Sequence, residues 1–180
     1  MFKDFSLTSL KTMKPRSDNS FDTMQEIKEL KKIPINKKFV KDHDDIEAIF
    51  LKVAKNNDVQ DYDAKLVNKL IRTSAPIILE LKKHFNRPRP KVLAKKMNIK
   101  MKDIEMDSMK TPSYPSGHSV QGILIAKVLG DKYPKAKNAF KKTGDDISYS
   151  RRVARAHYKS DSKLGESMGN LMYKHVKNKV

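Results

Sequence analysis

The spacing of the apolar residues is the feature that most constrains the fold of this chain. Apolar side chains recur every three or four residues along most of the sequence, and no segment of useful length alternates apolar with polar residues. Residues 117–129 form the most apolar stretch, which is typical of a helix that is buried nearly all round. The spacing therefore predicts an all-α fold, a single-domain helical bundle around this central apolar helix.

Local start and stop signals delimit the other helices. Ser20 is suited to be the N-cap of a short helix that Pro34 would end, and Pro76 should kink or split a longer one. Residues 91–114 show no clear period and predict a connecting segment that could hold one short helix. The expected helices cover residues 20–33, 42–55, 63–85, 117–129, 134 to beyond 149, and about 160–176.

Chain length and terminal composition predict the domain organisation. A chain of 180 residues suits one domain, and turn-forming residues predict a flexible basic arm over residues 1–19 before a helical domain over residues 20–180. The longest apolar runs are much shorter than the ~20 residues that span a bilayer. The first residues also lack the sustained hydrophobic segment of a secretion signal. We therefore expect a cytoplasmic protein without a transmembrane segment.

Charge and cysteine content narrow the possible partners. The formal charge of +18 would attract anions such as phosphorylated metabolites, nucleic acid or acidic lipid headgroups. The chain has no cysteine, which excludes disulfides, thiolate nucleophiles and cysteine-bound zinc. Arginine is much rarer than lysine in this chain, and most of its arginines are clustered. Because the planar guanidinium can donate two hydrogen bonds to one phosphate, this clustering indicates oxyanion-binding sites. The clustered arginines are Arg87, Arg89, Arg151, Arg152 and Arg155.

A first candidate segment joins the end of the helix expected over residues 63–85 to a stiff turn. Lys82 would lie near the helix end, and Arg89 lies between two prolines that favour extended backbone. Two cations could then converge on one anion. The structural alternative is a basic helix terminus that only favours its own dipole and solvent.

A second candidate segment begins the most apolar helix. A phosphate at this helix start would meet free amide hydrogens at Gly117, the hydroxyl of Ser116 and the positive end of the helix dipole. His118, in the first turn, would be within reach of a leaving-group oxygen. The structural alternative is an ordinary N-cap with an exposed histidine beside it.

A third candidate segment covers residues 150–161. Arg151 falls on an apolar helix face, and burying it costs free energy unless an anion or carboxylate pairs with it. His157 and Asp161 are four residues apart, so that the carboxylate could fix the tautomer of the ring and leave the other nitrogen free to attack. The structural alternative is an exposed pair on a helix surface that contributes little to stability.

Together, the three segments resemble the signature of the type 2 phosphatidic acid phosphatase (PAP2) superfamily. This superfamily also contains the bacterial class A nonspecific acid phosphatases and the vanadium-dependent haloperoxidases. Its signature is Lys, six residues, Arg-Pro; then Pro-Ser-Gly-His; then Ser-Arg, five residues, His, three residues, Asp. Every position of the signature is present in order. The Tyr-Pro-Ser-Gly-His form of the second motif is most similar to that of the acid phosphatases. The matching positions are Lys82, Arg89, Pro90, Pro115, Ser116, Gly117, His118, Ser150, Arg151, His157 and Asp161.

The resemblance, which covers about residues 63–180, implies a chemistry for each position. Lys82, Arg89, Arg151, Ser116 and the amide of Gly117 would bind the phosphate oxygens. His157 would be the nucleophile, with Asp161 orienting it and His118 acting as the general acid. No cofactor and no metal is implied, because the cations around the two histidines would repel a divalent ion, although phosphate or vanadate could occupy the site.

The resemblance implies a metal-independent phosphatase acting on phosphate monoesters, or on pyrophosphates or lipid phosphates, through a phosphohistidine. Two alternatives remain at this point. The same pocket could serve a vanadium-dependent haloperoxidase, because vanadate mimics pentavalent phosphorus. The charge of +18 is also compatible with a basic nucleic-acid-binding protein without catalysis. The natural substrate and the oligomeric state do not follow from the sequence.

Overall fold

Nine α-helices and two short 3₁₀ helices, with no strand, make up the computed structural model, which describes residues 1–180. The all-α prediction is therefore confirmed. The α-helices are α1 (Thr8–Lys11), α2 (Phe21–Lys32), α3 (Lys37–Asp42), α4 (Ile46–Asn56), α5 (Ala64–Phe85), α6 (Pro90–Lys96), α7 (Gly117–Lys132), α8 (Lys137–Val153) and α9 (Lys159–Val176). The 3₁₀ helices are η1 (Asp107–Lys110) and η2 (Pro134–Ala136).

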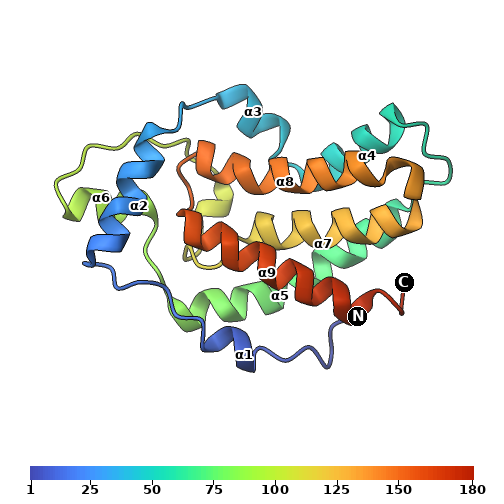
Figure 1. Ribbon diagram of the computed structural model, residues 1–180, viewed down its shortest axis with the longest axis horizontal. Helices are drawn as coiled ribbons and strands as arrows, with labels where there is room; N and C mark the ends of the chain where they lie inside the picture. Colours follow the sequence, from blue (N-terminus) through green and yellow to red (C-terminus); the bar gives the residue numbers. More distant parts are fainter.

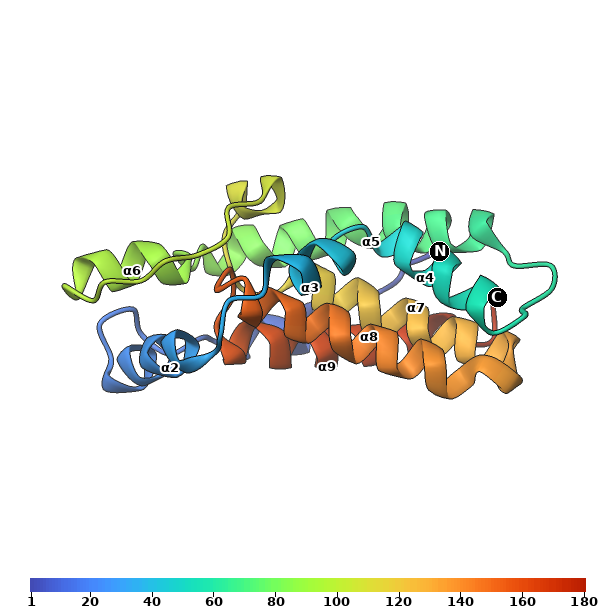
Figure 2. The same ribbon diagram turned by 90° about the horizontal axis from the view of Figure 1, so that it is seen from above.

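The central helix of the bundle is α7, as the apolar stretch predicted. It packs against α8 and α9 and also contacts α5. Figure 1 shows α7, α8 and α9 running alongside one another, and Figure 2 shows α5 along the other side of α7. Helices α2 and α6 lie together at one end of the molecule. The bundle thus brings the N-terminal ends of α7 and α9 close to the C-terminal end of α5.

Glycine allows α9 to approach α7 at the start of both helices. A Cβ atom added at Gly165 would lie 2.6 Å from the carbonyl oxygen of Ser116, and one at Gly169 would lie 2.6 Å from that of Val120. Real Cβ atoms do not come so close to another atom, so only glycine fits at this helix spacing. The backbone N–H of Ser116 also donates to the carbonyl of Asp161 at 3.0 Å. The contact fixes the beginning of α7 against the first turn of α9.

Capping side chains explain where several helices begin. The Ser20 hydroxyl accepts the N–H of Thr23, and the Asp63 carboxylate accepts that of Leu66, as expected of N-caps. The helix expected to begin at Asp42 begins at Ile46 instead, because the Asp45 side chain caps it by accepting the N–H of Ala48. The residues just before it form the separate short helix α3.

Three further segments can be compared with the prediction. Pro76, which was expected to kink or split the longer helix, lies inside α5 and does not split it. Helix α7 continues through Gly130 to Lys132, rather than ending at residue 129. Residues 91–114 contain most of α6 and also the turn η1, where one short helix was expected. Burial in the bundle overrides the local cost of proline and glycine at these positions.

Residues 1–19, expected to be a flexible basic arm, pack against the domain. Phe2 and Leu10 are buried in the main core, and α1 contacts α5. The backbone carbonyl of Met13 accepts a hydrogen bond from the Tyr114 hydroxyl at 2.8 Å, close to the second motif segment. The charged and turn-forming residues favour a flexible segment, but the apolar residues of this stretch can be buried against the main core and α5, and this burial holds the segment in place.

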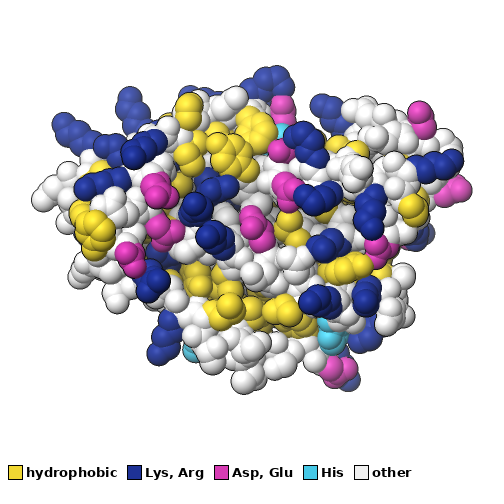
Figure 3. Space-filling model, viewed as in Figure 1, with side chains coloured by type: hydrophobic (Ala, Val, Ile, Leu, Met, Phe, Trp, Pro, Cys, Tyr) yellow, Lys and Arg dark blue, Asp and Glu magenta, His cyan; other side chains and the backbone are white.

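On the face seen in Figure 3, the positive charge is spread out and not collected in one area. Figure 3 shows Lys and Arg side chains across the whole visible face, with Asp and Glu side chains among them. Many of these charges belong to exposed pairs, such as Lys141 with Asp145 on α8. None of the helices combines the length and the hydrophobicity required to cross a bilayer.

Candidate active site

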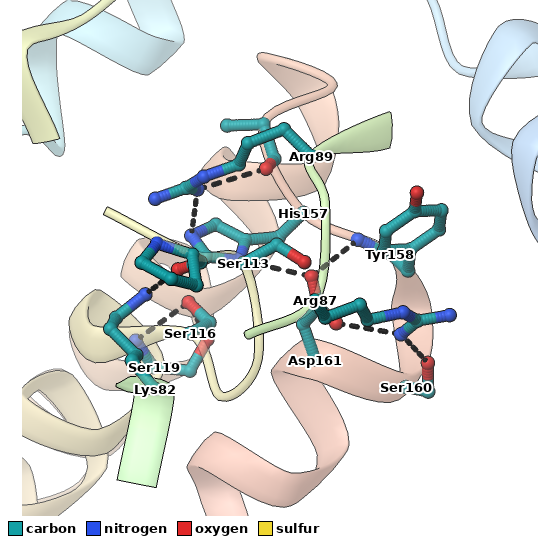
Figure 4. A network of polar contacts seen from close by, with 12 residues as sticks. Lys82, Arg87, Arg89, Ser113, Ser116, Ser119, His157, Tyr158, Ser160 and Asp161 are labelled. Atoms are coloured by element: carbon teal, nitrogen blue, oxygen red, sulfur yellow. Dashed lines mark hydrogen bonds and ion pairs between the residues drawn. The ribbon is translucent and has the colours of Figure 1, made fainter. Parts of the chain in front are cut away.

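His157 lies in the loop between α8 and α9, where two neighbours fix its orientation. Its Nδ1 is 3.2 Å from the Oδ2 atom of Asp161, and its Nε2 is 2.8 Å from an Nη1 atom of Arg89. A guanidinium can only donate hydrogen bonds, so Nε2 must accept and Nδ1 must carry the proton. The ring is therefore held in the tautomer that leaves the lone pair of Nε2 directed at the cations (Figure 4).

Burial and nearby positive charges keep the His157 ring neutral. The side chain is 4% exposed, and burial is the largest cause that holds its pKa well below the usual value. A neutral imidazole whose Nε2 atom carries no proton can act as a nucleophile at pH 7. The charged groups that lower the pKa further are Arg89, Lys82, His118 and Arg151.

Lys82 and Arg89 reach the same place from the end of α5 and from the turn that follows it. The Nζ atom of Lys82 donates to the carbonyl of Pro112 at 2.5 Å, and Arg89 donates to the carbonyls of Thr111 and Ser108, each at 2.9 Å. Burial lowers the pKa of Lys82 to about 7 and that of Arg89 to about 10. Neither cation touches a carboxylate, so both would gain by binding an anion.

Ser116 caps α7 and lies beside Lys82 in Figure 4. Its hydroxyl oxygen accepts the N–H of Ser119 at 3.3 Å and contacts the Ser119 hydroxyl at 2.9 Å. The contacts continue to Ser148 and end at the carboxylate of Glu166, at 2.8 and 2.6 Å. The start of α7 therefore offers an oriented hydroxyl and free amide hydrogens to an anion.

Gly117 lies close to α5 at this helix start. A Cβ atom built on Gly117 would lie 3.5 Å from the nearest atom of Ile78 and 3.9 Å from the Cε atom of Lys82. The backbone of Gly117 is thus close to the lysine side chain, and its N–H is one of the first of the helix, which have no partner within the helix.

His118 and Arg151 meet at a carboxylate that the sequence did not reveal. The Oδ1 atom of Asp44 is 2.7 Å from an Nη1 atom of Arg151 and 3.4 Å from the Nε2 atom of His118. The backbone carbonyl of Asp44 lies 3.0 Å from the same Nε2 atom. The hydrogen bond with His118, followed by that with Arg151, lowers the pKa of Asp44 to about 2. Asp44 supplies the partner that a buried Arg151 requires.

The structure thus brings the predicted site residues together in two adjoining groups. Figure 4 shows Lys82, Arg89, Ser116 and His157 around one place, with Asp161 behind the histidine. The second group is His118 with Arg151, whose charges act on the pKa of His157.

Three residues of the site were missed by the sequence reasoning. Asp44 and Glu26 had no sequence signal, since each lies more than 60 residues before the arginine that it binds. Arg87 did have a sequence signal, because it belongs to the cluster of arginines. It binds Asp161 and leaves the anion site to Arg89.

Curated proteins with similar sequences are bacterial acid phosphatases. A non-specific acid phosphatase of Salmonella typhimurium is 35% identical over 88 residues, which are 49% of this chain and 35% of the relative. An acid phosphatase of Zymomonas mobilis is 33% identical over 107 residues, which are 59% of this chain and 40% of the relative. The chain therefore matches well under half the length of these relatives. No model of a known protein family matches the sequence.

A solved structure agrees over the whole chain. The transmembrane PAP2-type phosphatidylglycerolphosphate phosphatase of Bacillus subtilis superposes with a TM-score of 0.63 over 99% of this chain and 96% of its own. The resemblance to the PAP2 superfamily is confirmed. At 17% identity the solved structure shows that the PAP2 fold is shared. The PAP2 fold therefore occurs here in a chain in which no helix could span a membrane.

Proposed function

We propose that this protein is a phosphatase that hydrolyses phosphate monoesters through a covalent phosphohistidine at His157. The observation that carries the proposal is the His157 ring itself, which is neutral, oriented by Asp161, and directed at Arg89 beside Lys82. A nucleophilic nitrogen next to two buried cations without carboxylate partners suits attack on a phosphate group. The acid phosphatase relatives support the same reaction class.

In the first step, the Nε2 atom of His157 attacks phosphorus opposite the leaving oxygen. The N–P bond forms as the P–O bond breaks, and His118 donates its proton to the departing alkoxide. Lys82, Arg89 and Arg151 would hold the nonbridging oxygens, which gain charge in the transition state. Asp161 would stabilise the positive charge that develops on the His157 ring.

In the second step, water attacks the phosphohistidine. His118, now neutral, takes a proton from the water as the N–P bond breaks, and inorganic phosphate leaves. Each proton in this cycle is carried by a side chain, so the scheme needs no metal ion. Lys82, whose pKa burial lowers to about 7, would be more fully protonated when a phosphate dianion is bound than when the site is empty, because the dianion offsets the cost of burying its charge.

A panel of phosphorylated compounds, assayed with EDTA present, tests this function. The panel contains an aryl phosphate, an alkyl phosphate, nucleotides, sugar phosphates, pyrophosphate and a lipid phosphate. We expect release of inorganic phosphate from at least one monoester, with no loss on addition of EDTA. Halide oxidation with peroxide and vanadate, in place of hydrolysis, would favour a haloperoxidase instead.

The variant His157→Ala tests the nucleophile. It should lower turnover by on the order of 10³-fold or more, because the ring makes and breaks the bond to phosphorus. His84→Ala is the matched control, since His84 is exposed near the end of α5, and it should keep full activity. Appreciable hydrolysis by folded His157→Ala would contradict the assignment, and salt-sensitive nucleic-acid binding that survives the substitution would indicate a binding protein.

A further inference from the structure

Arg87 is a buried arginine to which the proposed mechanism gives no task. Its side chain is 0% exposed and is held on three sides. Nη1 donates to Asp161 at 2.8 Å and to Ser160 at 2.7 Å, and Nη2 donates to Glu26 at 3.1 Å. The guanidinium also stacks on the ring of Tyr158 at 3.8 Å. A fully buried cation with so many partners is rigidly placed.

Arg87 and Arg89 serve different parts of the site, although they are only two residues apart. Figure 4 shows Arg89 against His157, on the side of Lys82, whereas Arg87 lies on the far side of Asp161, towards Ser160. Their hydrogen-bond partners differ accordingly, because Arg87 donates to Asp161 whereas an Nη1 atom of Arg89 is 2.8 Å from the Nε2 atom of His157. Arg87 is therefore directed at the carboxylate and away from the proposed phosphate position.

Asp161 depends on Arg87 for its charge. The side chain of Asp161 is 0% exposed, and Arg87 is the one arginine or lysine that forms an ion pair with it. Burial raises the pKa of Asp161 to about 7, and the charge of Arg87 is the largest influence in the opposite direction. The other groups near the carboxylate are the His157 ring, the Tyr158 N–H and, farther away, the charges of Lys82 and Arg89 and the hydroxyls of Tyr114 and Tyr158.

A protonated Asp161 could not orient the histidine as the mechanism requires. Its Oδ2 atom accepts both the Tyr158 N–H at 3.0 Å and the His157 Nδ1–H at 3.2 Å, so the carboxylate must offer lone pairs to both. A proton on Oδ2 would remove the acceptor that fixes the tautomer, and a proton on Oδ1 would remove the negative charge that strengthens both hydrogen bonds. The lone pair of Nε2 would then no longer be directed reliably at phosphorus.

We propose that Arg87, held from behind by Glu26 of α2, is a positioning residue that keeps Asp161 in its acceptor form and so aims His157 at the substrate. This inference rests on the proposed role of His157. Glu26 is well placed for its part, because its carboxylate also accepts the N–H and the hydroxyl of Ser160 at the start of α9, both at 2.7 Å. Helix α2 thereby belongs to the support of the catalytic centre.

The test compares the pH dependence of kcat for Arg87→Gln, Arg87→Lys and wild type on an aryl phosphate. Without the guanidinium, the pKa of Asp161 rises, so the acidic limb of the profile should move to higher pH. Arg87→Gln should lose on the order of tenfold or more in kcat at the acidic end and recover as the pH rises, with KM little changed. Arg87→Lys, which retains one positive charge, should restore part of the profile.

Arg155→Gln is the matched control. Arg155 also ties α2 to the domain, through the carbonyls of Lys31 and Ile33, and makes no contact with Asp161. Its pH profile should overlay that of wild type. A loss in Arg87→Gln by the same factor at every pH, or an unshifted profile, would overturn the inference. Should Arg87→Gln fail to fold, Arg87→Lys carries the same comparison.

A measurement without turnover separates this inference from the proposed function. The Nδ1 proton of His157, bonded to a buried carboxylate, should give a downfield proton signal in the NMR spectrum. We expect this signal at neutral pH in wild type, and only at higher pH in Arg87→Gln. If wild type hydrolyses no phosphate ester, the proposed function fails, and the NMR comparison still decides the role of Arg87. An identical signal in both proteins would contradict it.

Discussion

The substitution Gly165→Ala would push α9 away from the start of α7. The added methyl group would lie 2.6 Å from the carbonyl oxygen of Ser116 and 2.8 Å from the Cβ atom of Ser119. The first of these atoms is backbone and cannot rotate out of the way. The two helices must therefore separate, and Ser116, which caps α7 and lies beside Lys82, must move with them.

Two opposing effects set the magnitude. Alanine is favoured over glycine inside a helix by about 1 kcal/mol. Forcing an extra methyl group into a tightly packed contact typically costs about 1–3 kcal/mol, and more where backbone must shift. Because the contact at Gly165 is shorter than any that real Cβ atoms make, we take the upper end of this cost. The expected net loss is about 2 kcal/mol of the free energy of unfolding.

Urea unfolding and phosphatase assays on the same preparation measure both consequences. The control is Gly130→Ala on α7, where the added methyl group would lie 3.1 Å from the Cγ atom of the flexible Lys137 side chain. This variant should be as stable as wild type or slightly more so, and fully active. Gly165→Ala should be less stable and lose at least tenfold in kcat, a loss expected from a displaced site. Wild-type stability and activity in Gly165→Ala would refute the reasoning.

Two further predictions concern His118 and Asp44. His118→Ala should lower kcat/KM for alkyl phosphates by on the order of 10²-fold or more, and that for aryl phosphates much less, because aryl leaving groups are weaker bases and depend less on a proton; equal losses in kcat/KM, which reports the first chemical step, would count against an acid role. Asp44→Asn should lower the free energy of unfolding at pH 7 by roughly 1 kcal/mol, a value discounted because the carboxylate is partly exposed. The pKa of Asp44 is lowered from 3.8 to about 2, so its contribution is fully present above pH 4 and is lost as the pH falls through about 2. Urea titrations of both proteins should therefore differ most above pH 4 and approach each other towards pH 2, and a difference as large at pH 2 as at pH 7 would contradict the ion-pair explanation.

The sequence predicted the fold well where local patterns and tertiary packing agree. The apolar stretch at residues 117–129 became the central helix, and the capping residues Ser20 and Asp63 mark helix starts. Local signals misled where packing overrides them. Residues 1–19 read as an arm because charge and turn residues dominate the stretch, yet Phe2 and Leu10 find apolar partners that no local pattern reveals.

The motif residues were predictable because their chemistry requires fixed residue types at fixed spacing. The four-residue spacing of His157 and Asp161 anticipated their contact, although His157 lies in the loop before α9 and only Asp161 is helical. Their supporting residues were not predictable. The burial of Arg151 indicated that it needs an anionic partner, but not which one, since Asp44 is 107 residues away in the sequence. An ion pair between residues far apart in the sequence produces no pattern at helical spacing, so a single sequence does not reveal it.

Two carboxylates reach the site from the first 63 residues, Glu26 of α2 and Asp44 of the loop before α4, and they limit how the chain can be truncated. A fragment cut at residue 63 would carry every motif residue and yet leave Arg87 and Arg151 inside the bundle with one ionic partner fewer each. Removing a carboxylate partner from a buried guanidinium lowers the stability of the fold, although Arg87 would keep its ion pair with Asp161. Grafting the motif segments into another scaffold would therefore transplant the reacting groups but not the counter-charges that make their burial tolerable.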